Sequence, residues 1–258
     1  NEILRRSTRE TNPVSRFGYN DYMAYHYAFM MKVAADREPE SIAKAAKNPW
    51  WVNAMNEEMQ ALSKNETWDL VPHSPHKKEI SCRWIYKVKY NVDGSVNRYK
   101  ARLIAKGYAQ THGVDYDETF APVAKMTIVQ TVIALVLPKG WHLHQMDVKN
   151  VFLQGELEEE VYMVQSPGFE SNIHPKVVCR LKKSLYDLQE APRAWHSKIT
   201  QYLHRIDFRM SKSDNSLYVR SDSSPIVIIL YVDDLDIGGE HLVDINKVKS
   251  LLSSKFEM

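Results

Sequence analysis

The sequence predicts an α+β fold. Helical and strand patterns both occur along the chain, but they do not alternate regularly as they would in a protein built from βαβ units. The composition is that of a globular protein, since 44% of the 258 residues are hydrophobic and 26% are charged. These proportions exclude a disordered tail, a collagen-like repeat and a coiled-coil rod.

The N-terminal part of the chain predicts a linker or arm followed by a helix. Residues 1–47 are basic and polar, with no sustained periodicity. Asn48 can cap a helix and Pro49 suits its first position, so we expect a helix from here to about Asn65. The residues at helical spacing on it are Trp51, Ala54, Met55, Glu58, Met59 and Leu62.

A β-hairpin is expected next. In residues 83–90, Trp84, Tyr86, Val88 and Tyr90 fall on one face and Lys87 and Lys89 on the other, as in a half-buried strand. Asp93-Gly94 supplies turn residues, and residues 98–105 alternate again. The segment 83–106 therefore predicts two antiparallel strands.

The remaining elements follow from apolar periodicity and from helix-stop residues. An apolar stripe from Met126 to Val136 predicts a helix, because Pro138 and Gly140 follow it. A continuous β-branched run at residues 226–232 predicts a strand buried on both faces. We also expect a strand at 141–147, a helix from Pro192, and a final helix after Gly238-Gly239.

The charges are separated along the chain, although the formal net charge is only +2. Residues 77–110 contain nine basic side chains and two acidic ones, whereas residues 113–160 contain eight acidic and three basic ones. A protein that grips phosphates and holds metal ions with carboxylates needs this polarity. Runs of charge are, however, also usual on solvated faces.

The sharpest local feature is Tyr231-Val232-Asp233-Asp234, at the end of the apolar run. Two adjacent carboxylates are costly to bury unless a cation or solvent compensates them. Consecutive strand residues point to opposite faces, so only one of the two can join a site on a given face unless a tight turn begins here. A third carboxylate must come from elsewhere. Asp147, at the end of another expected strand, is the candidate. By itself, an Asp-Asp pair more often marks a surface turn.

Seven motifs follow one another along the chain. They are Arg98-Tyr99-Lys100-Ala101-Arg102-Leu103, Asp115-Tyr116-Asp117-Glu118-Thr119-Phe120-Ala121-Pro122-Val123, Gln145-Met146-Asp147-Val148-Lys149-Asn150, Glu158-Glu159-Glu160-Val161-Tyr162-Met163, Leu181-Lys182-Lys183-Ser184-Leu185-Tyr186, Ala191-Pro192-Arg193-Ala194-Trp195 and Tyr231-Val232-Asp233-Asp234. In this order they resemble the reverse transcriptases of copia-type retrotransposon polyproteins, over about residues 49 to 258. Tyr-Val-Asp-Asp alone would be a weak signal, but seven ordered motifs are specific.

The resemblance implies a right-hand polymerase, with a palm built on a ferredoxin-like antiparallel sheet. It assigns residues 1–47 to the basic arm that follows the integrase in such polyproteins. Residues 48–140 would be mainly fingers, including the basic hairpin 83–106, and residues 141–258 mainly palm. The thumb and the RNase H domain are expected to lie outside this sequence.

The resemblance also implies the site. Asp147, Asp233 and Asp234 match the catalytic carboxylates, which in this family hold two Mg²⁺ ions, with Mn²⁺ as a substitute; Asp147 and Asp233 are the expected direct ligands of both ions. Lys100 and Arg102 match the residues that hold the incoming triphosphate, and at alternate strand positions they share one face. Phe152 matches the aromatic residue that excludes a ribose 2′-hydroxyl. Phe152 is also compatible with an ordinary core position, and Lys100 and Arg102 with a solvated strand face.

The implied activity is RNA-directed DNA polymerisation on an RNA or DNA template with a primer, using deoxynucleoside triphosphates. The implied partners include the rest of the polyprotein, with integrase upstream and RNase H downstream, and no membrane. The implied location is the cytoplasm, including virus-like particles. Two cysteines form no disulfide framework or zinc site, which agrees with a reducing compartment.

Departures from the family pattern leave other functions open. The family usually has Gly, Lys and Gln where this chain has Asp187, Gln189 and Glu190, Ala where it has Val151, and an apolar residue where it has Asp236. Such changes favour a decayed nucleic-acid-binding remnant of the same domain as the alternative. A two-metal nuclease is a third reading, although a nuclease has no need of a triphosphate clamp.

Overall fold

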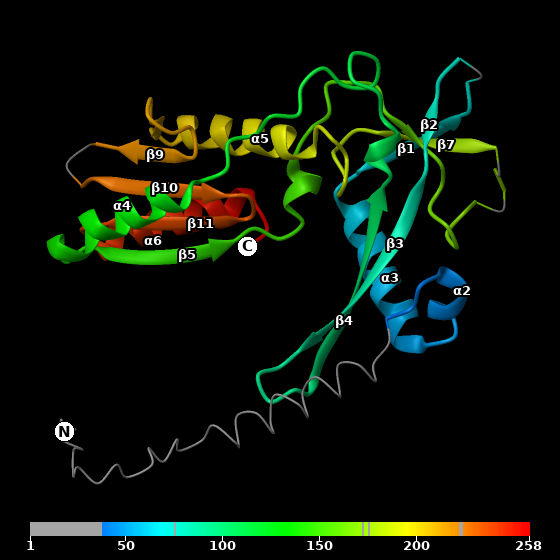
Figure 1. Cartoon of the computed structure of the whole chain (residues 1–258), viewed down its shortest axis with the longest axis horizontal. Coiled ribbons are helices and arrows are strands. Elements are labelled where there is room, and N and C mark those ends of the chain that lie inside the picture. Colours follow the sequence, from blue (N-terminus) through cyan, green and yellow to red (C-terminus); the bar gives the residue numbers. More distant parts are fainter. Residues whose placement is uncertain (1–37, 75, 172, 175, 222–223) are drawn as a thin grey trace, which may run out of the picture.

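The computed structural model describes residues 38–74, 76–171, 173–174, 176–221 and 224–258 (Figure 1). Most of the expected N-terminal arm therefore lies outside the described residues. The last part of that arm, where no element was expected, forms a single turn of helix, α2 (Ile42–Ala45). The Ser41 side chain caps its N-terminus.

The described residues contain both helices and several small sheets, which confirms the α+β class. The longer helices are α3 (Pro49–Lys64), α4 (Met126–Val136), α5 (Ala191–Arg205) and α6 (Leu242–Lys255). Three short 3₁₀ helices are η1 (Gly107–Ala109), η2 (Leu137–Lys139) and η3 (Val151–Gln154). The strands are β1 (Trp68–Pro72), β2 (Glu79–Ile80), β3 (Cys82–Tyr90), β4 (Val96–Ala105), β5 (His142–Asp147), β6 (Tyr162–Met163), β7 (Val177–Leu181), β8 (Arg209–Met210), β9 (Leu217–Arg220), β10 (Ile226–Tyr231) and β11 (Asp234–Gly239).

Helix α3 forms where its capping residues predict it. The Asn48 side chain accepts a hydrogen bond from the Trp50 amide at 2.9 Å, and Pro49 takes the first helical position. The face turned to the protein interior carries Trp51, Ala54, Met55, Glu58 and Leu62. One of these buried side chains, Glu58, is charged.

Strands β3 and β4 form the expected hairpin, which extends away from the rest of the molecule in Figure 1. The side chains of Trp84, Tyr86 and Val88 in β3 are buried in the protein interior, while the residues between them are exposed. The cross-strand register places Lys87 opposite Lys100 and Lys89 opposite Arg98. Like charges opposite each other destabilise an antiparallel pair, so the hairpin carries internal repulsion.

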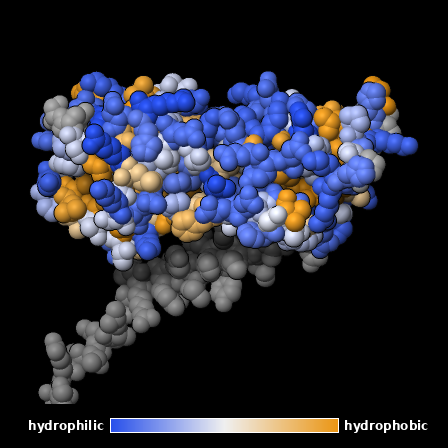
Figure 2. Space-filling view, turned by 90° about the horizontal axis from the view of Figure 1, so that it is seen from above, coloured by the Kyte–Doolittle hydropathy of each residue, from blue (hydrophilic) through white to orange (hydrophobic). Residues whose placement is uncertain are grey.

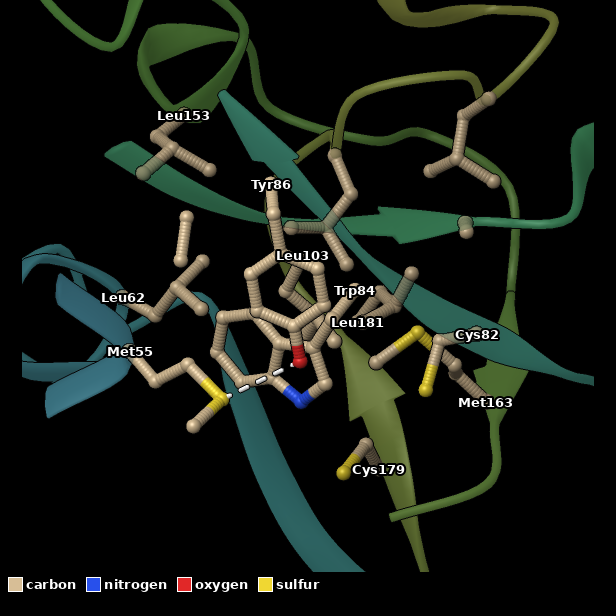
Figure 3. Packing of buried hydrophobic residues seen from close by; sticks show 14 of the residues in the cluster. Met55, Leu62, Cys82, Trp84, Tyr86, Leu103, Leu153, Met163, Cys179 and Leu181 are labelled. Atoms are coloured by element: carbon tan, nitrogen blue, oxygen red, sulfur yellow. Dashed lines mark hydrogen bonds between the residues drawn. The ribbon is translucent and has the colours of Figure 1, made fainter. Parts of the chain in front are cut away.

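The first hydrophobic core lies between α3, the hairpin and a four-stranded sheet with strand order β1-β7-β6-β2. Figure 3 shows how Met55 and Leu62 of α3 meet Tyr86 and Leu103 of the hairpin. The Tyr86 hydroxyl donates to the Met55 sulfur at 3.4 Å. The two cysteines, Cys82 and Cys179, are free and buried here.

The second core lies on a five-stranded antiparallel sheet with strand order β5-β11-β10-β9-β8. Its central strand β10 is buried on both faces, as the β-branched run predicts. Ile226, Ile228 and Leu230 pack with residues of α5 and α6, whereas Ile229 packs with Val132 and Val136 of α4. Figure 1 shows α4 and α6 on opposite sides of this sheet.

The chain passes between the two cores more than once. Helix α4 packs on the five-stranded sheet, although it precedes residue 140, and Leu153, Met163, Leu181 and Leu185 return to the first core. Phe152 contacts both cores. The hydrophobic clusters therefore do not divide the chain at a single position.

The surface is mostly hydrophilic in the view of Figure 2, with small hydrophobic patches toward both ends. Within the described residues, none of the helices has both the length and the apolar character that crossing a membrane requires.

Candidate active site

Asp233 lies in a two-residue turn that joins β10 to β11. Tyr231 pairs with Asp234 across the turn, so Val232 and Asp233 are its central residues. Val232 has a φ of 55°, a conformation in which its branched side chain is strained. The Trp195 indole donates a hydrogen bond to the Val232 carbonyl at 2.7 Å, and the Val148 amide donates to the Asp233 carbonyl at 2.9 Å. These two bonds hold the turn in place.

The second acidic strand end lies beside this turn. Asp147, the last residue of β5, is directly opposite Asp234 in the β5–β11 pair. The Gln145 side chain donates to one Asp234 oxygen at 3.0 Å. Burial and the neighbouring charges of Asp233 and Asp147 raise the pKa of Asp234. The fold thus gathers three carboxylates from two chain segments at one end of the sheet.

These carboxylates suit a divalent cation by their chemistry. Mg²⁺ prefers hard oxygen donors, and a cation would remove the repulsion that raises the pKa of Asp234. Among the residues that the structure describes, no three His, Cys, Asp or Glu side chains converge closely enough to hold a metal ion as they stand. A bound ion would therefore have to draw the aspartates toward itself.

A cleft of about 410 Å³ connects the aspartates to the basic hairpin. Asp147 and Asp233 line it, and so do Arg98, Lys100 and Arg102 of β4. Asp234 does not line the cleft. The tight turn thus directs Asp233, rather than Asp234, to the same opening as Asp147, and the separated charges of the sequence meet in one place.

The basic side chains in the cleft differ in their surroundings. Arg102 forms an ion pair with Glu58 of α3, with 2.6 Å between Nη1 and Oε2, and its guanidinium lies 5.0 Å from the centre of the Tyr186 ring. Lys100 forms no ion pair with a described residue. Burial, followed by the nearby charges of Arg102 and Arg98, lowers the pKa of Lys100. An anion in the cleft would relieve this repulsion.

Phe152 lies behind the cleft rather than on its surface. It is half-buried in η3 and packs edge-to-face against Tyr186, with ring centres 5.1 Å apart. Tyr186 itself lines the cleft. The structure thus brings five of the six predicted site residues around one end of the sheet and the cleft, and places Phe152 one aromatic ring away.

The unusual residues near the site have clear structural effects. Asp187 has a φ of 71°, a conformation that favours glycine. Any residue other than glycine at position 107 would place its Cβ atom 1.9 Å from the Asp187 carbonyl oxygen. Gly107, which has no Cβ atom, permits this close approach. Burial raises the pKa of Glu190, and burial together with the charge of Asp234 raises the pKa of Asp236.

Three residues in or next to the site were missed as functional residues in the sequence. Glu58 was detectable, because a carboxylate on an apolar helix stripe signals a buried ion pair. Tyr186 and Trp195 both lie in the recognised motifs, but nothing in their spacing indicates a ring over Arg102 or a bond to the aspartate turn.

Comparison with known proteins adds independent evidence. The family model described as "Reverse transcriptase (RNA-dependent DNA polymerase)" matches residues 65–258. The chain is 46% identical over 234 residues to the Retrovirus-related Pol polyprotein from transposon RE1 of Arabidopsis thaliana, which covers 90% of this chain and 16% of that protein. It is 45% identical, with the same coverage, to the polyprotein from transposon RE2 of the same plant.

A tobacco relative covers almost all of the chain. Identity to the Retrovirus-related Pol polyprotein from transposon TNT 1-94 of Nicotiana tabacum is 39% over 260 residues, which is 99% of this chain and 19% of that protein. The chain thus spans less than a fifth of the length of these curated relatives. Because the family model and these relatives cover most of its residues, the chain belongs to the reverse transcriptase family, as a domain of the kind found in copia-type retrotransposon Pol polyproteins.

Proposed function

We propose that this domain extends a primer on an RNA or DNA template, by joining a deoxynucleoside monophosphate to the primer 3′-hydroxyl and releasing pyrophosphate. One observation carries the proposal. A single cleft is lined both by Asp147 and Asp233, called here its acidic wall, and by Lys100 and Arg102, called its basic wall. A nuclease would need the carboxylates but has no evident use for the basic wall.

The basic wall suits the triphosphate. Arg102 offers a planar set of N–H donors and Lys100 a compact charge, and both project from the same face of β4. The repulsion that lowers the pKa of Lys100 would be replaced by attraction to phosphate oxygens. These residues would bind and orient the nucleotide beside the aspartates.

The acidic wall suits two Mg²⁺ ions, with Asp147 and Asp233 as the main ligands and Asp234 beside them. When bound, such ions lower the pKa of the attacking hydroxyl and stabilise the charge on the leaving oxygen. The protein contributes the strained turn at Val232, which fixes where Asp233 points, and the strand pair that places Asp147 next to it.

The aromatic pair suits selection of the sugar. Phe152 supports Tyr186 from behind, so the ring at the cleft surface cannot move away freely. In this proposal Phe152 excludes a ribose 2′-hydroxyl together with Tyr186.

The architecture supports a polymerase palm and fingers. The five-stranded antiparallel sheet, with α5 and α6 packed on one face and the aspartates at one end, would be the palm on a ferredoxin-like plan. The hairpin β3–β4 and α3 would belong to the fingers. Integrase upstream and RNase H downstream complete the proposed polyprotein.

Primer extension tests the proposal. A labelled DNA primer on an RNA template should be extended with deoxynucleoside triphosphates and Mg²⁺, and also with Mn²⁺. Asp233→Asn should reduce the rate by at least about 1,000-fold, because it removes a metal-binding carboxylate. The assay should use this chain and, in parallel, the chain extended by the segment that follows in its transposon relatives.

Asp236→Asn is the matched control. It removes a carboxylate from the adjoining strand β11 that does not line the cleft, so extension should persist. Circular dichroism would show that both variants are folded. Extension that survives Asp233→Asn would contradict the site.

A non-catalytic nucleic-acid-binding remnant is the second candidate, because three carboxylates occupy unfavourable positions. Asp187 has a positive φ, and the pKa values of Glu190 and Asp236 are raised by burial. If decay explains an inactive chain, Asp187→Gly, Gln189→Lys, Glu190→Gln and Asp236→Leu together should restore extension. No recovery would argue against this candidate.

A further inference from the structure

Glu58 is a buried acid in an otherwise apolar helix face. Its residue exposure is 3%, and its neighbours on this face include Ala54, Met55 and Leu62 of the first core. Burial raises the pKa of Glu58, and the charge and hydrogen bond of Arg102 oppose this effect. A carboxylate in such a place is costly, so its presence needs a reason other than packing.

The reason lies in what Glu58 contacts. Its Oε2 atom accepts a bond from Nη1 of Arg102 at 2.6 Å. On another side, the guanidinium of Arg102 lies over the ring of Tyr186, 5.0 Å from its centre, and Tyr186 is supported by Phe152. Arg102 is thus held from two sides, by Glu58 of α3 and by the Tyr186 ring, whereas Lys100 on the same strand face has no ion pair among the described residues.

The contact leaves Arg102 able to bind an anion. A guanidinium has five N–H donors, and this ion pair uses one nitrogen. The side chain of Arg102 is still 23% exposed and lines the cleft. Glu58 fixes the direction of the Arg102 guanidinium group without occupying all of its N–H donors.

We propose that Glu58 is a positioning residue, which orients Arg102 for the triphosphate group of the incoming nucleotide. The inference rests on the proposed function. Glu58 also lines the cleft, but its carboxylate is bonded to Arg102, so in this proposal it acts on the nucleotide through Arg102. Its loss should weaken nucleotide binding much more than it slows the chemical step.

The test compares Glu58→Gln with the wild-type chain. The amide keeps the size and one acceptor but loses the charge that holds the guanidinium. We expect the dissociation constant for a deoxynucleoside triphosphate, measured by titration calorimetry, to rise about tenfold. In primer extension, KM should rise similarly, while kcat changes by less than about twofold.

Two further variants separate positioning from other effects. Glu57→Gln removes the adjacent carboxylate, which lines the same cleft and bonds only to Asn53 among the described residues, so it shows the effect of charge alone. In an Arg102→Lys background, Glu58→Gln should add little to the dissociation constant, because the two residues act as one unit. Circular dichroism would verify folding of every variant.

The outcomes are distinct. Triphosphate binding without extension would contradict the proposed function but leave the positioning role standing. Unchanged affinity in Glu58→Gln would overturn the positioning role of Glu58 but not the proposed function. Tighter binding in this variant would overturn it too, since it would mean that Glu58 competes with the triphosphate for Arg102. Failure of the wild-type chain to bind triphosphate would overturn both.

Discussion

At the residue scale, Glu190 shows how one substitution makes stability depend on pH. Both of its carboxylate oxygens lie near the Gln110 side-chain amide, at 3.0 and 3.2 Å, and the residue is 2% exposed. Burial raises the pKa of Glu190 above 4.5 in the folded chain. The contribution of such a group is complete below pH 4.5 and is lost as the pH rises through the folded-state pKa.

Glu190→Gln should therefore stabilise the protein at high pH. The amide bonds to Gln110 without a buried charge, so we expect a gain of about 1 kcal/mol near pH 8 and a much smaller gain near pH 5. Urea denaturation at the two pH values measures the difference. Glu156→Gln is the control of opposite sign, because Lys198 lowers the pKa of that carboxyl. An equal gain at both pH values would contradict the explanation.

At the element scale, the turn between β10 and β11 depends on a helix that is distant in sequence. Trp195 of α5 is 2% exposed and bonds to the carbonyl of Val232. The helix thus both covers the sheet and restrains the turn that carries Asp233. The indole N–H group of Trp195 therefore couples the packing of α5 on the sheet to the position of the Asp233 carboxylate.

Trp195→Phe should separate these two contributions. The ring keeps most of the apolar contact, so the free energy of unfolding should fall by only about 1–2 kcal/mol. The kcat of primer extension should fall about tenfold, because the strained turn loses one of its restraints. Trp84→Phe is the matched control, since Trp84 is also buried and donates to a backbone carbonyl, that of Pro167. A similar loss of kcat in both variants would refute the coupling.

Elements with a local signal could be predicted from the sequence. The hairpin β3–β4 was predictable because its alternation and its Asp93-Gly94 turn are contiguous, and α3 because Asn48 and Pro49 mark its start. The sheet β1-β7-β6-β2 was not predicted. Its strands are two to five residues long, and β1 pairs with residues 177–181, so non-local contacts, rather than local preference, stabilise it.

At the scale of the whole molecule, the site could be predicted only in part. The aspartates and the basic strand carry residue types that indicate their chemistry. Their meeting in one cleft depends on how the two cores are joined, and no pattern in the sequence gives that arrangement. The position of Glu58 on an apolar helix stripe indicates a buried ion pair, but the sequence does not identify its partner, Arg102, which lies 44 positions away.

The charge distribution predicts how nucleic acid should bind. Despite the net charge of +2, the hairpin places Lys89 opposite Arg98, and both are exposed. Affinity for an RNA–DNA duplex should fall steeply with salt concentration. Lys89→Gln should reduce the slope of log affinity against log salt by about one, because one phosphate contact is lost.

Lys212→Gln is the control for this measurement, since Lys212 is exposed beside the short strand β8, at the far edge of the five-stranded sheet. Filter binding at several salt concentrations measures the slope. Equal slopes for Lys89→Gln and the wild-type chain would exclude the hairpin from duplex contact.

The pairing of β1 with β7 also affects how the chain folds during its synthesis. Trp68 leaves the ribosome long before its partner Leu181 exists. At roughly 5–20 residues per second, this interval is on the order of ten seconds. During that time the apolar face of α3 and the hairpin lacks the sheet that covers it, so the nascent chain exposes an unfinished core until residue 181 emerges. The yield of folded chain should therefore depend on whether this intermediate is protected from aggregation.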